Sequence, residues 1–155
     1  MEFFEFADVE ASESGIREKL TLDALPRLCA EIESVEEAEE LGRVVYFVEW
    51  GRYHIRRDEV MGGVRFWVPD CPNALAWTVT TGYPPHPEKI VLHATINRTC
   101  HDQEFIDATK ALIAALKEGL EGSPGAVGRK PEPGEPLIGD LRGKRQGVKE
   151  GRHER

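Results

Sequence analysis

The sequence predicts an α+β fold: an N-terminal helical segment, an antiparallel sheet of four to five strands, one C-terminal amphipathic helix packed on the sheet, and a flexible tail. Short segments between 44 and 97 are rich in β-branched and aromatic residues and alternate between apolar and polar positions, which is typical of half-buried strands. Residues 99–122 follow directly and carry apolar side chains three or four positions apart, which predicts a helix with one apolar face. From Ser123 onward Gly, Pro and charged residues dominate.

The first predicted hairpin joins a strand at 44–50 to a strand at 53–57 through Gly51 and Arg52. A two-residue loop with Gly first is typical of a type II′ turn. This closure gives a consistent register with apolar pairs on one face and polar pairs on the other. The expected pairs are Trp50 with Tyr53, Glu49 with His54, Val48 with Ile55, and Phe47 with Arg56.

Three more strands are expected at 63–68, 74–81 and 88–97, each with alternating apolar and polar residues. The helix that follows begins near Thr99, where Asp102 completes an acidic variant of the capping box. Gly122 is placed to end it. Its apolar stripe consists of Phe105, Ile106, Thr109, Leu112, Ile113, Leu116 and Leu120.

A helical segment is also expected before the sheet, with Asp23 as its N-cap and Gly42 after its last apolar position. Ser34 and Glu37 form a second capping signature, so one helix and two helices both fit the pattern. The repeating apolar positions are Leu25, Leu28, Ile32, Val35, Ala38 and Leu41. Its other face is strongly acidic, which suits a solvated surface or a basic partner.

Composition divides the chain into an acidic Phe-rich arm at 1–15, a single α+β domain at 16–122 and a Gly/Pro/charged tail at 123–155. The formal net charge is −8, yet the tail holds eight Lys and Arg against five Asp and Glu. An acidic body repels phosphate backbones, which argues against nucleic acid as a partner. The sequence contains no membrane-length apolar run, and its start is acidic rather than basic, so we expect a cytoplasmic protein.

The arm and the tail suggest a protein partner or a homo-oligomer. Three phenylalanines in a short acidic segment are poorly suited to water, so we expect the arm to form an added edge strand, to dock on the domain, or to bind a partner. The loop at 81–87 is stiffened by prolines and displays two aromatic rings, which suits a contact surface or a rigid connector. The candidate partner-binding residues are Phe3, Phe4, Phe6, Tyr83, His86, Leu137, Ile138 and Leu141.

A polar face of the sheet, opposite the C-terminal helix, is the candidate site for ligand chemistry. A carboxylate beside an imidazole can orient it for acid or base work, an arginine can hold an anion, and a tryptophan can stack on a planar group. An ordinary solvent-exposed sheet face, or one covered by the N-terminal helices, explains the same pattern. The candidate ligand-binding residues are Glu49, His54, Arg56, Arg65, Trp67 and His93.

The three cysteines are Cys29, Cys71 and Cys100, an odd number without CxxC spacing, so we expect reduced thiols and no disulfide framework. The run Cys100-His101-Asp102 suggests a metal site or a cysteine nucleophile, but no pair has the usual ligand spacing and we expect no metal. A buried, inert thiol is the ordinary alternative. No phosphate loop, dinucleotide-binding or hydrolase motif is present, so no cofactor is expected and no catalytic residue is assigned.

Two functions remain. The arm, the acidic helix face and the tail favour a non-catalytic interaction or accessory protein, a small subunit of a larger assembly. The alternative is a small-molecule-binding or hydrolytic domain that uses the polar sheet face.

Overall fold

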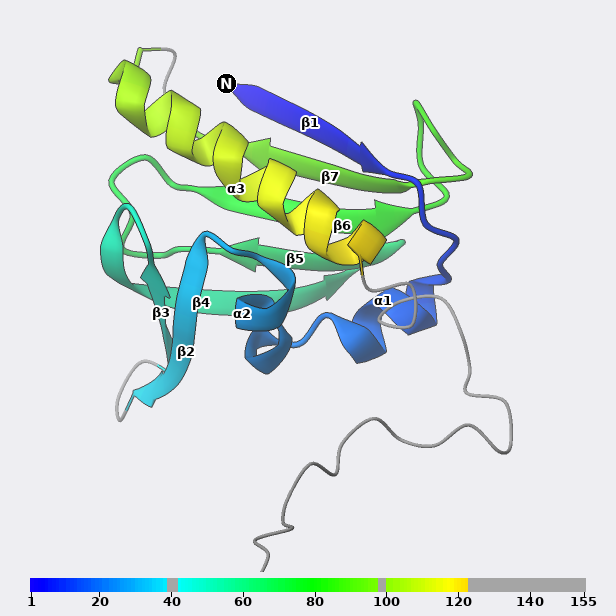
Figure 1. The fold of residues 1–155 in the computed structure, drawn as a ribbon, viewed down its shortest axis with the longest axis horizontal. Helices are drawn as coiled ribbons and strands as arrows, with labels where there is room; N and C mark the ends of the chain where they lie inside the picture. Colours follow the sequence, from blue (N-terminus) through cyan, green and yellow to red (C-terminus); the bar gives the residue numbers. More distant parts are fainter. Residues whose placement is uncertain (39–41, 98–99, 123–155) are drawn as a thin grey trace, which may run out of the picture.

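A seven-stranded antiparallel sheet and a long C-terminal helix dominate the computed structural model, which describes residues 1–38, 42–97 and 100–122 (Figure 1). This confirms the predicted α+β fold and C-terminal helix, but the prediction of four to five strands was too low. The tail, Thr99 and the partner-binding candidates Leu137, Ile138 and Leu141 lie outside the described residues. The elements are β1 (Glu2–Ala7), α1 (Glu13–Lys19), the 3-10 turn η1 (Leu22–Ala24), α2 (Leu25–Leu28), β2 (Ile32–Ala38), β3 (Gly42–Phe47), β4 (Gly51–Val60), β5 (Gly63–Trp67), β6 (Ala76–Thr81), β7 (Ile90–Thr95) and α3 (Gln103–Gly122).

The strands are ordered β1-β7-β6-β5-β4-β3-β2, so every neighbouring pair from β2 to β7 is a sequential hairpin. The Phe-rich segment forms β1, which pairs with β7 at one edge of the sheet, with Phe4 opposite His93. This is the edge-strand arrangement that we expected as one use of the arm. The opposite edge is β2, which pairs only with β3.

The prediction of a helix over 25–41 is wrong beyond Leu28, where α2 ends. Residues Ile32–Ala38 form β2 instead. The register of β2 against β3 shifts between Ile32 and Ser34, and such a bulge changes which side chains face the core. Ile32 is buried and Val35 packs against the core, although they are three residues apart. The bulge therefore gives a strand an apolar spacing that resembles a helix.

The hairpin register predicted around Gly51 is also wrong. Phe47 pairs with Gly51, and residues 48–50 form a three-residue turn between β3 and β4. Gly51 has a φ of +75°, the left-handed conformation that follows a type I turn in hairpins of this length. His54 therefore faces Val44 across the strands, and Glu49 lies in the turn.

The helix α1 fixes the hairpin of β4 and β5 on the core side of the sheet. Its N-cap, Ser12, accepts a hydrogen bond from the Gly15 N–H at 3.0 Å. The carboxylate of Glu13 accepts from the Gly62 N–H at 2.8 Å, at the turn between β4 and β5. Arg57 donates from β4 to the carbonyls of Leu20 and Arg17, where α1 ends.

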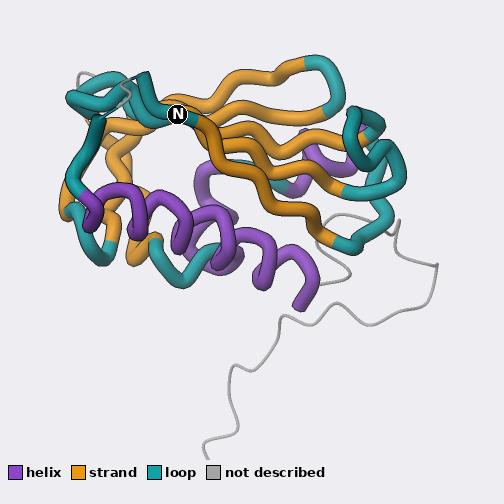
Figure 2. Tube along the Cα trace, turned by 90° about the horizontal axis from the view of Figure 1, so that it is seen from above, coloured by secondary structure: helices purple, strands orange, loops and turns teal. Residues whose placement is uncertain are grey.

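The helix α3 lies along one side of the sheet (Figure 2). Leu112, Ile113, Leu116 and Leu120 are buried from α3, in the same cluster as the inward-facing side chains of the strands. We call the sheet face toward α3 the inner face and the opposite one the outer face. Gly119 brings the helix close to α2, since a Cβ built there would lie 1.9 Å from the Leu28 carbonyl oxygen. Among the described residues, no helix is long and apolar enough to cross a membrane.

Candidate functional site

An apolar pocket with a volume of about 120 Å³ lies on the inner face, near the start of α3. It is bounded by the turn between β3 and β4, the connection between β5 and β6, and the first turn of α3. We call it the inner pocket. Its lining residues are Phe47, Trp50, Tyr53, Val68, Cys71, Pro72, Asn73, Leu75 and Phe105.

Four of its nine described lining residues have aromatic side chains. The ring centroids of Phe47 and Trp50 are 5.1 Å apart, those of Trp50 and Phe105 5.3 Å, and those of Phe47 and Tyr53 6.2 Å. Edge-to-face and tilted contacts of this kind are favourable between aromatic rings. The turn after β3 places the Trp50 side chain at the end of the core, where its ring contacts that of Phe105 from α3.

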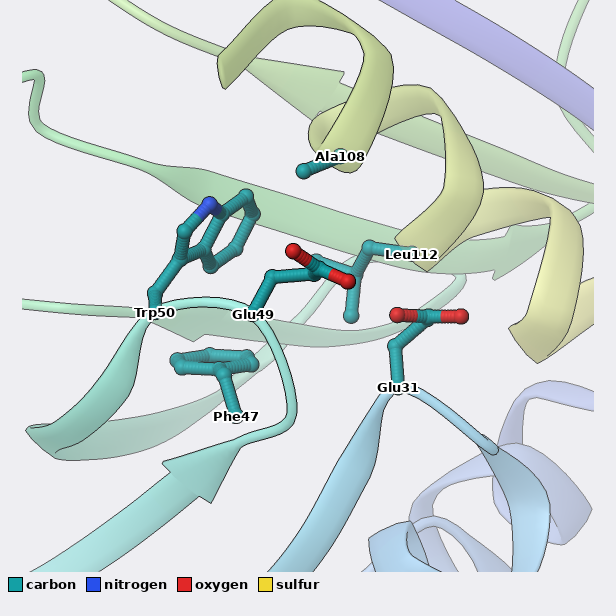
Figure 3. Close-up of a pocket in the computed structure, with 6 residues that line it drawn as sticks. All are labelled: Glu31, Phe47, Glu49, Trp50, Ala108 and Leu112. Carbon is teal, nitrogen blue, oxygen red and sulfur yellow. The ribbon is translucent and has the colours of Figure 1, made fainter. Parts of the chain in front are cut away.

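A narrow crevice adjoins the inner pocket beneath α3, and Phe47 and Trp50 belong to both. Figure 3 shows Glu31, just before β2, and Glu49, from the turn, directed into this space beside Leu112. The crevice has no room for a water-sized molecule. The apolar pocket is therefore bordered on one side by two carboxylates.

Trp77 lies behind the wall of the pocket. It is 1% exposed, and its ring packs against Phe47 and Phe66 with centroids 6.4 and 5.4 Å away. Within the described part of the chain, its indole N–H has no hydrogen-bond partner. A buried donor without a partner is uncommon in proteins and costs stability.

Five of the six predicted ligand-binding residues share the outer face, and Glu49 does not. Arg56 on β4 pairs with Trp67 on β5. Arg65 pairs with Thr78 on β6, which pairs in turn with His93 on β7. His54, two residues before Arg56, has the same orientation in the pleat. The five are His54, Arg56, Arg65, Trp67 and His93.

A groove with a volume of about 410 Å³ runs over β4 and β5 on this face. Asp70 accepts hydrogen bonds from the His54 backbone N–H at 3.0 Å and contacts its ring Nδ1 at 2.8 Å. The indole N–H of Trp67 donates to Asp58 at 2.8 Å. We call this the outer groove, and it is lined by His54, Arg56, Arg57, Asp58, Trp67, Pro69 and Asp70.

The carboxyl group of Asp70 is held in its ionised form. Burial acts to raise its pKa, but the hydrogen bonds from the side chain and backbone of His54 outweigh this effect and hold the pKa below its usual value. Asp58 and Asp70 were not among the predicted residues. Extending the alternation of β4 past Arg57 would have found Asp58, whereas Asp70 follows β5 in a turn and carries no such signal.

His93 lies apart from the outer groove, because β6 separates its strand from β5. Its ring stacks on Phe4 with a centroid distance of 4.3 Å, and its Nε2 lies 3.3 Å from Glu2. The predicted site is therefore divided: four residues lie on β4 and β5, and His93 belongs to an aromatic contact with β1.

The described partner-binding candidates are used mainly within the chain. Phe3 packs against the core, and Phe6 meets His86 edge-on at 4.6 Å. Tyr83 covers the turn between β4 and β5, since a Cβ on Gly62 would lie 2.4 Å from its ring. Phe4 alone among the phenylalanines of β1 is largely exposed, at 47%. Partner binding at these positions stays a prediction.

The three thiols differ in exposure, and Cys71 lines the inner pocket. Cys29 is buried, and this burial raises the pKa of its thiol to about 12. Cys100 is exposed, so the expectation of a buried thiol at that position is wrong. Among the described residues, no group of three His, Cys, Asp or Glu side chains is arranged to hold a metal ion.

We expect three distinct rates of alkylation by iodoacetamide at about pH 8, because the thiolate is the reactive form. Cys100 reacts first, Cys71 more slowly, and Cys29 only after unfolding. Peptide mapping by mass spectrometry at successive times measures all three. Modification of Cys29 at the rate of Cys100 in the folded protein would contradict this burial.

Solved structures with this fold are known. The protein XoxI from Bacillus cereus matches with a TM-score of 0.56 and 12% sequence identity, over 79% of this chain and 94% of that one. A START superfamily protein from Mycobacterium smegmatis matches with a TM-score of 0.52 and 12% identity, over 80% and 97%. Ara h 8.0201 matches with a TM-score of 0.54 and 16% identity, over 80% and 95%. No family model and no curated protein matches the sequence.

These matches show that the chain shares its fold with these three proteins, one of them a START superfamily protein, and this finding overturns the main expectation of a non-catalytic accessory subunit. A helix laid across a sheet, with an apolar pocket between them, is an arrangement suited to ligand binding. The Phe-rich arm, which favoured the accessory role, is a strand of the sheet. The alternative expectation, a small-molecule-binding or hydrolytic domain, agrees better with the architecture, although it was placed on the polar sheet face and not in this pocket.

Proposed function

We propose that the protein binds a small aromatic ligand in the inner pocket. The observation that carries this proposal is the apolar space of about 120 Å³ walled by Phe47, Trp50, Tyr53 and Phe105. An apolar cavity of about 150 Å³ is enough to hold benzene. This pocket is slightly smaller, so the part of the ligand that it encloses is no larger than about one aromatic ring.

The polar groups of the pocket favour a ring with a single hydroxyl or carbonyl group. Asn73 and Tyr53 are the lining residues with strongly polar side-chain atoms. A few polar groups among apolar ones are what fixes a ligand's orientation in a pocket. None of the described lining residues is charged, which favours a neutral ligand.

The test uses p-cresol as the probe, with toluene for comparison, and follows the protein by two-dimensional ¹H–¹⁵N NMR. We expect p-cresol to shift the Trp50 indole signal and the Phe105 amide signal in a saturable way. Toluene should shift the same signals at higher concentration, because it lacks the hydroxyl group. A titration that leaves both signals unmoved contradicts the proposal.

A matched pair of variants separates the pocket from the surface. Cys71→Phe places a ring in the pocket and should weaken p-cresol binding by about tenfold or more, whereas Cys100→Phe makes the same change at an exposed position and should leave it unaltered. The Trp77 indole signal reports whether each variant keeps its packed core. Unchanged binding in a folded Cys71→Phe variant would place the ligand elsewhere.

A further inference from the structure

The outer groove has a chemistry unlike that of the inner pocket, and it lies on the opposite face of the sheet. Both of its carboxylates are already engaged: Asp70 with the backbone and ring of His54, and Asp58 with the indole N–H of Trp67. Each carboxylate therefore fixes the orientation of a ring. The groups left for a ligand are the far nitrogen of His54, the face of the indole, and the side chain of Arg56.

Arg56 is an exposed cation beside this fixed pair of rings. Its strand position is directly opposite Trp67, which places the two side-chain bases about 5 Å apart. Its guanidinium group lies over Gly42 of β3, since a Cβ built on Gly42 would be 3.6 Å from Nη1 of Arg56. Among the described residues no carboxylate forms an ion pair with Arg56.

The surroundings of the groove are basic, although the protein as a whole has a net charge of −8. Arg52 precedes His54 on the same face of β4, and Arg65 pairs with Asp58 across β4 and β5. Both arginines are exposed, and in the described part of the chain neither takes part in an ion pair. Arg52, Arg56 and Arg65 therefore bring three guanidinium groups to the sheet face that carries the groove.

We infer that the outer groove is a second ligand site, and that it takes a planar aromatic ring carrying a phosphate or carboxylate group. The guanidinium of Arg56 suits the anionic group, because arginine forms paired hydrogen bonds with carboxylates and phosphates. The indole of Trp67 offers a surface for the ring. His54, oriented by Asp70, presents its second ring nitrogen for one further hydrogen bond.

The size of the groove agrees with this ligand. Its volume of about 410 Å³ falls within the range of about 300 to 1,000 Å³ that small-molecule sites occupy. The inference stands on observations of the outer face alone and does not depend on the inner pocket. Because the two sites have different tryptophans in their walls, one spectrum distinguishes them.

Phenyl phosphate is the test probe, and ¹H–¹⁵N NMR gives two signals that belong to the groove itself. These are the Trp67 indole N–H, bonded to Asp58, and the His54 backbone N–H, bonded to Asp70. We expect both to shift in a saturable way with phenyl phosphate. Inorganic phosphate and benzyl alcohol, which each lack one half of the probe, should bind at least about tenfold more weakly.

Two variants assign the roles of the side chains. Arg56→Gln should weaken phenyl phosphate binding by about tenfold, whereas Arg27→Gln, the same charge change at an exposed position of α2, should not alter it. Trp67→Leu should weaken phenyl phosphate binding, followed at the His54 amide, without altering the weak response to inorganic phosphate.

Four outcomes overturn the inference. They are an absence of shifts at both groove signals, equal affinity for inorganic phosphate and phenyl phosphate, equal losses in Arg56→Gln and Arg27→Gln, and full phenyl phosphate affinity in folded Trp67→Leu. Shifts at the Trp50 indole alone would locate the probe in the inner pocket, which overturns the second site and leaves the proposed function standing. Failure of p-cresol to bind leaves the groove result unchanged.

Discussion

Gly119→Ala is expected to lower the free energy of unfolding by about 3 kcal/mol, although alanine is normally the better helix former. The new Cβ would lie 1.9 Å from the Leu28 carbonyl oxygen and 2.6 Å from its carbonyl carbon. These are backbone atoms, so the clash cannot be relieved by turning a side chain. α3 and α2 would have to move apart, which disturbs the core that both helices share.

The matched control is Gly122→Ala at the end of the same helix. No atom lies within 4 Å of a Cβ built there. We therefore expect a change of less than about 1 kcal/mol. Urea unfolding followed by circular dichroism measures both variants, and the melting temperature of Gly119→Ala should fall by about 10 °C. Equal stabilities for the two variants would show that α3 does not approach α2 this closely.

Arg57→Met is expected to lower the free energy of unfolding by about 2 to 3 kcal/mol. Arg57 donates to the Leu20 carbonyl at 2.7 Å and to the Arg17 carbonyl at 2.5 Å, at the C-terminal end of α1. Helix ends leave carbonyls without partners inside the helix, and a cation there also suits the helix dipole. Methionine keeps the apolar stem but leaves both carbonyls without this donor.

Arg52→Met is the control, because Arg52 is exposed on the same strand and we expect a change within about 0.5 kcal/mol. Arg57→Lys separates charge from geometry, since lysine keeps the positive charge but lacks the planar fork that reaches two carbonyls. Urea unfolding should place Arg57→Lys between Arg57→Met and the unaltered protein. If lysine restores full stability, charge alone explains the role of Arg57.

The strands from β4 to β7 and the helix α3 could be predicted because each carries its own signal. In β5, Val64 and Phe66 are buried while Arg65 is exposed, so one face of the strand can be identified without its neighbours. In α3, Leu112, Ile113, Leu116 and Leu120 are all buried, as the apolar stripe indicates. In β5 and α3 the side chains that alternate with, or lie opposite, the buried ones are exposed or half-buried, so the residue pattern indicates which face is buried.

The errors occurred where pairing between strands determines the structure. In β2 a bulge turns Ile32 and Val35 to the same side, so its spacing favours a helix. At the hairpin, the position of the turn decides the register, and a three-residue loop moves Glu49 out of the sheet. Neither feature can be distinguished from its alternative by the local sequence.

The candidate sites were predicted unevenly for the same reason. Alternation along β4 and β5 was enough to bring His54, Arg56 and Trp67 to one face. The inner pocket was missed because Phe47 and Phe105 come from separate segments that each resemble ordinary core. The pocket exists because of the way in which α3 crosses the sheet, and no local sequence pattern predicts this crossing.

The pairing of β1 with β7 has a consequence for how the protein is made. Each residue of β1 pairs with a residue of β7 that is more than eighty positions later in the chain, from Ala7 with Ile90 to Glu2 with Thr95. At common rates of translation, β7 is synthesised on the order of ten seconds after β1. Contacts so distant along the chain also slow folding. During this interval Phe3 and Phe6 lack their final neighbours. Glu2 and Glu5, which flank the Phe3-Phe4 pair, are the groups that oppose association of the nascent strand with other chains.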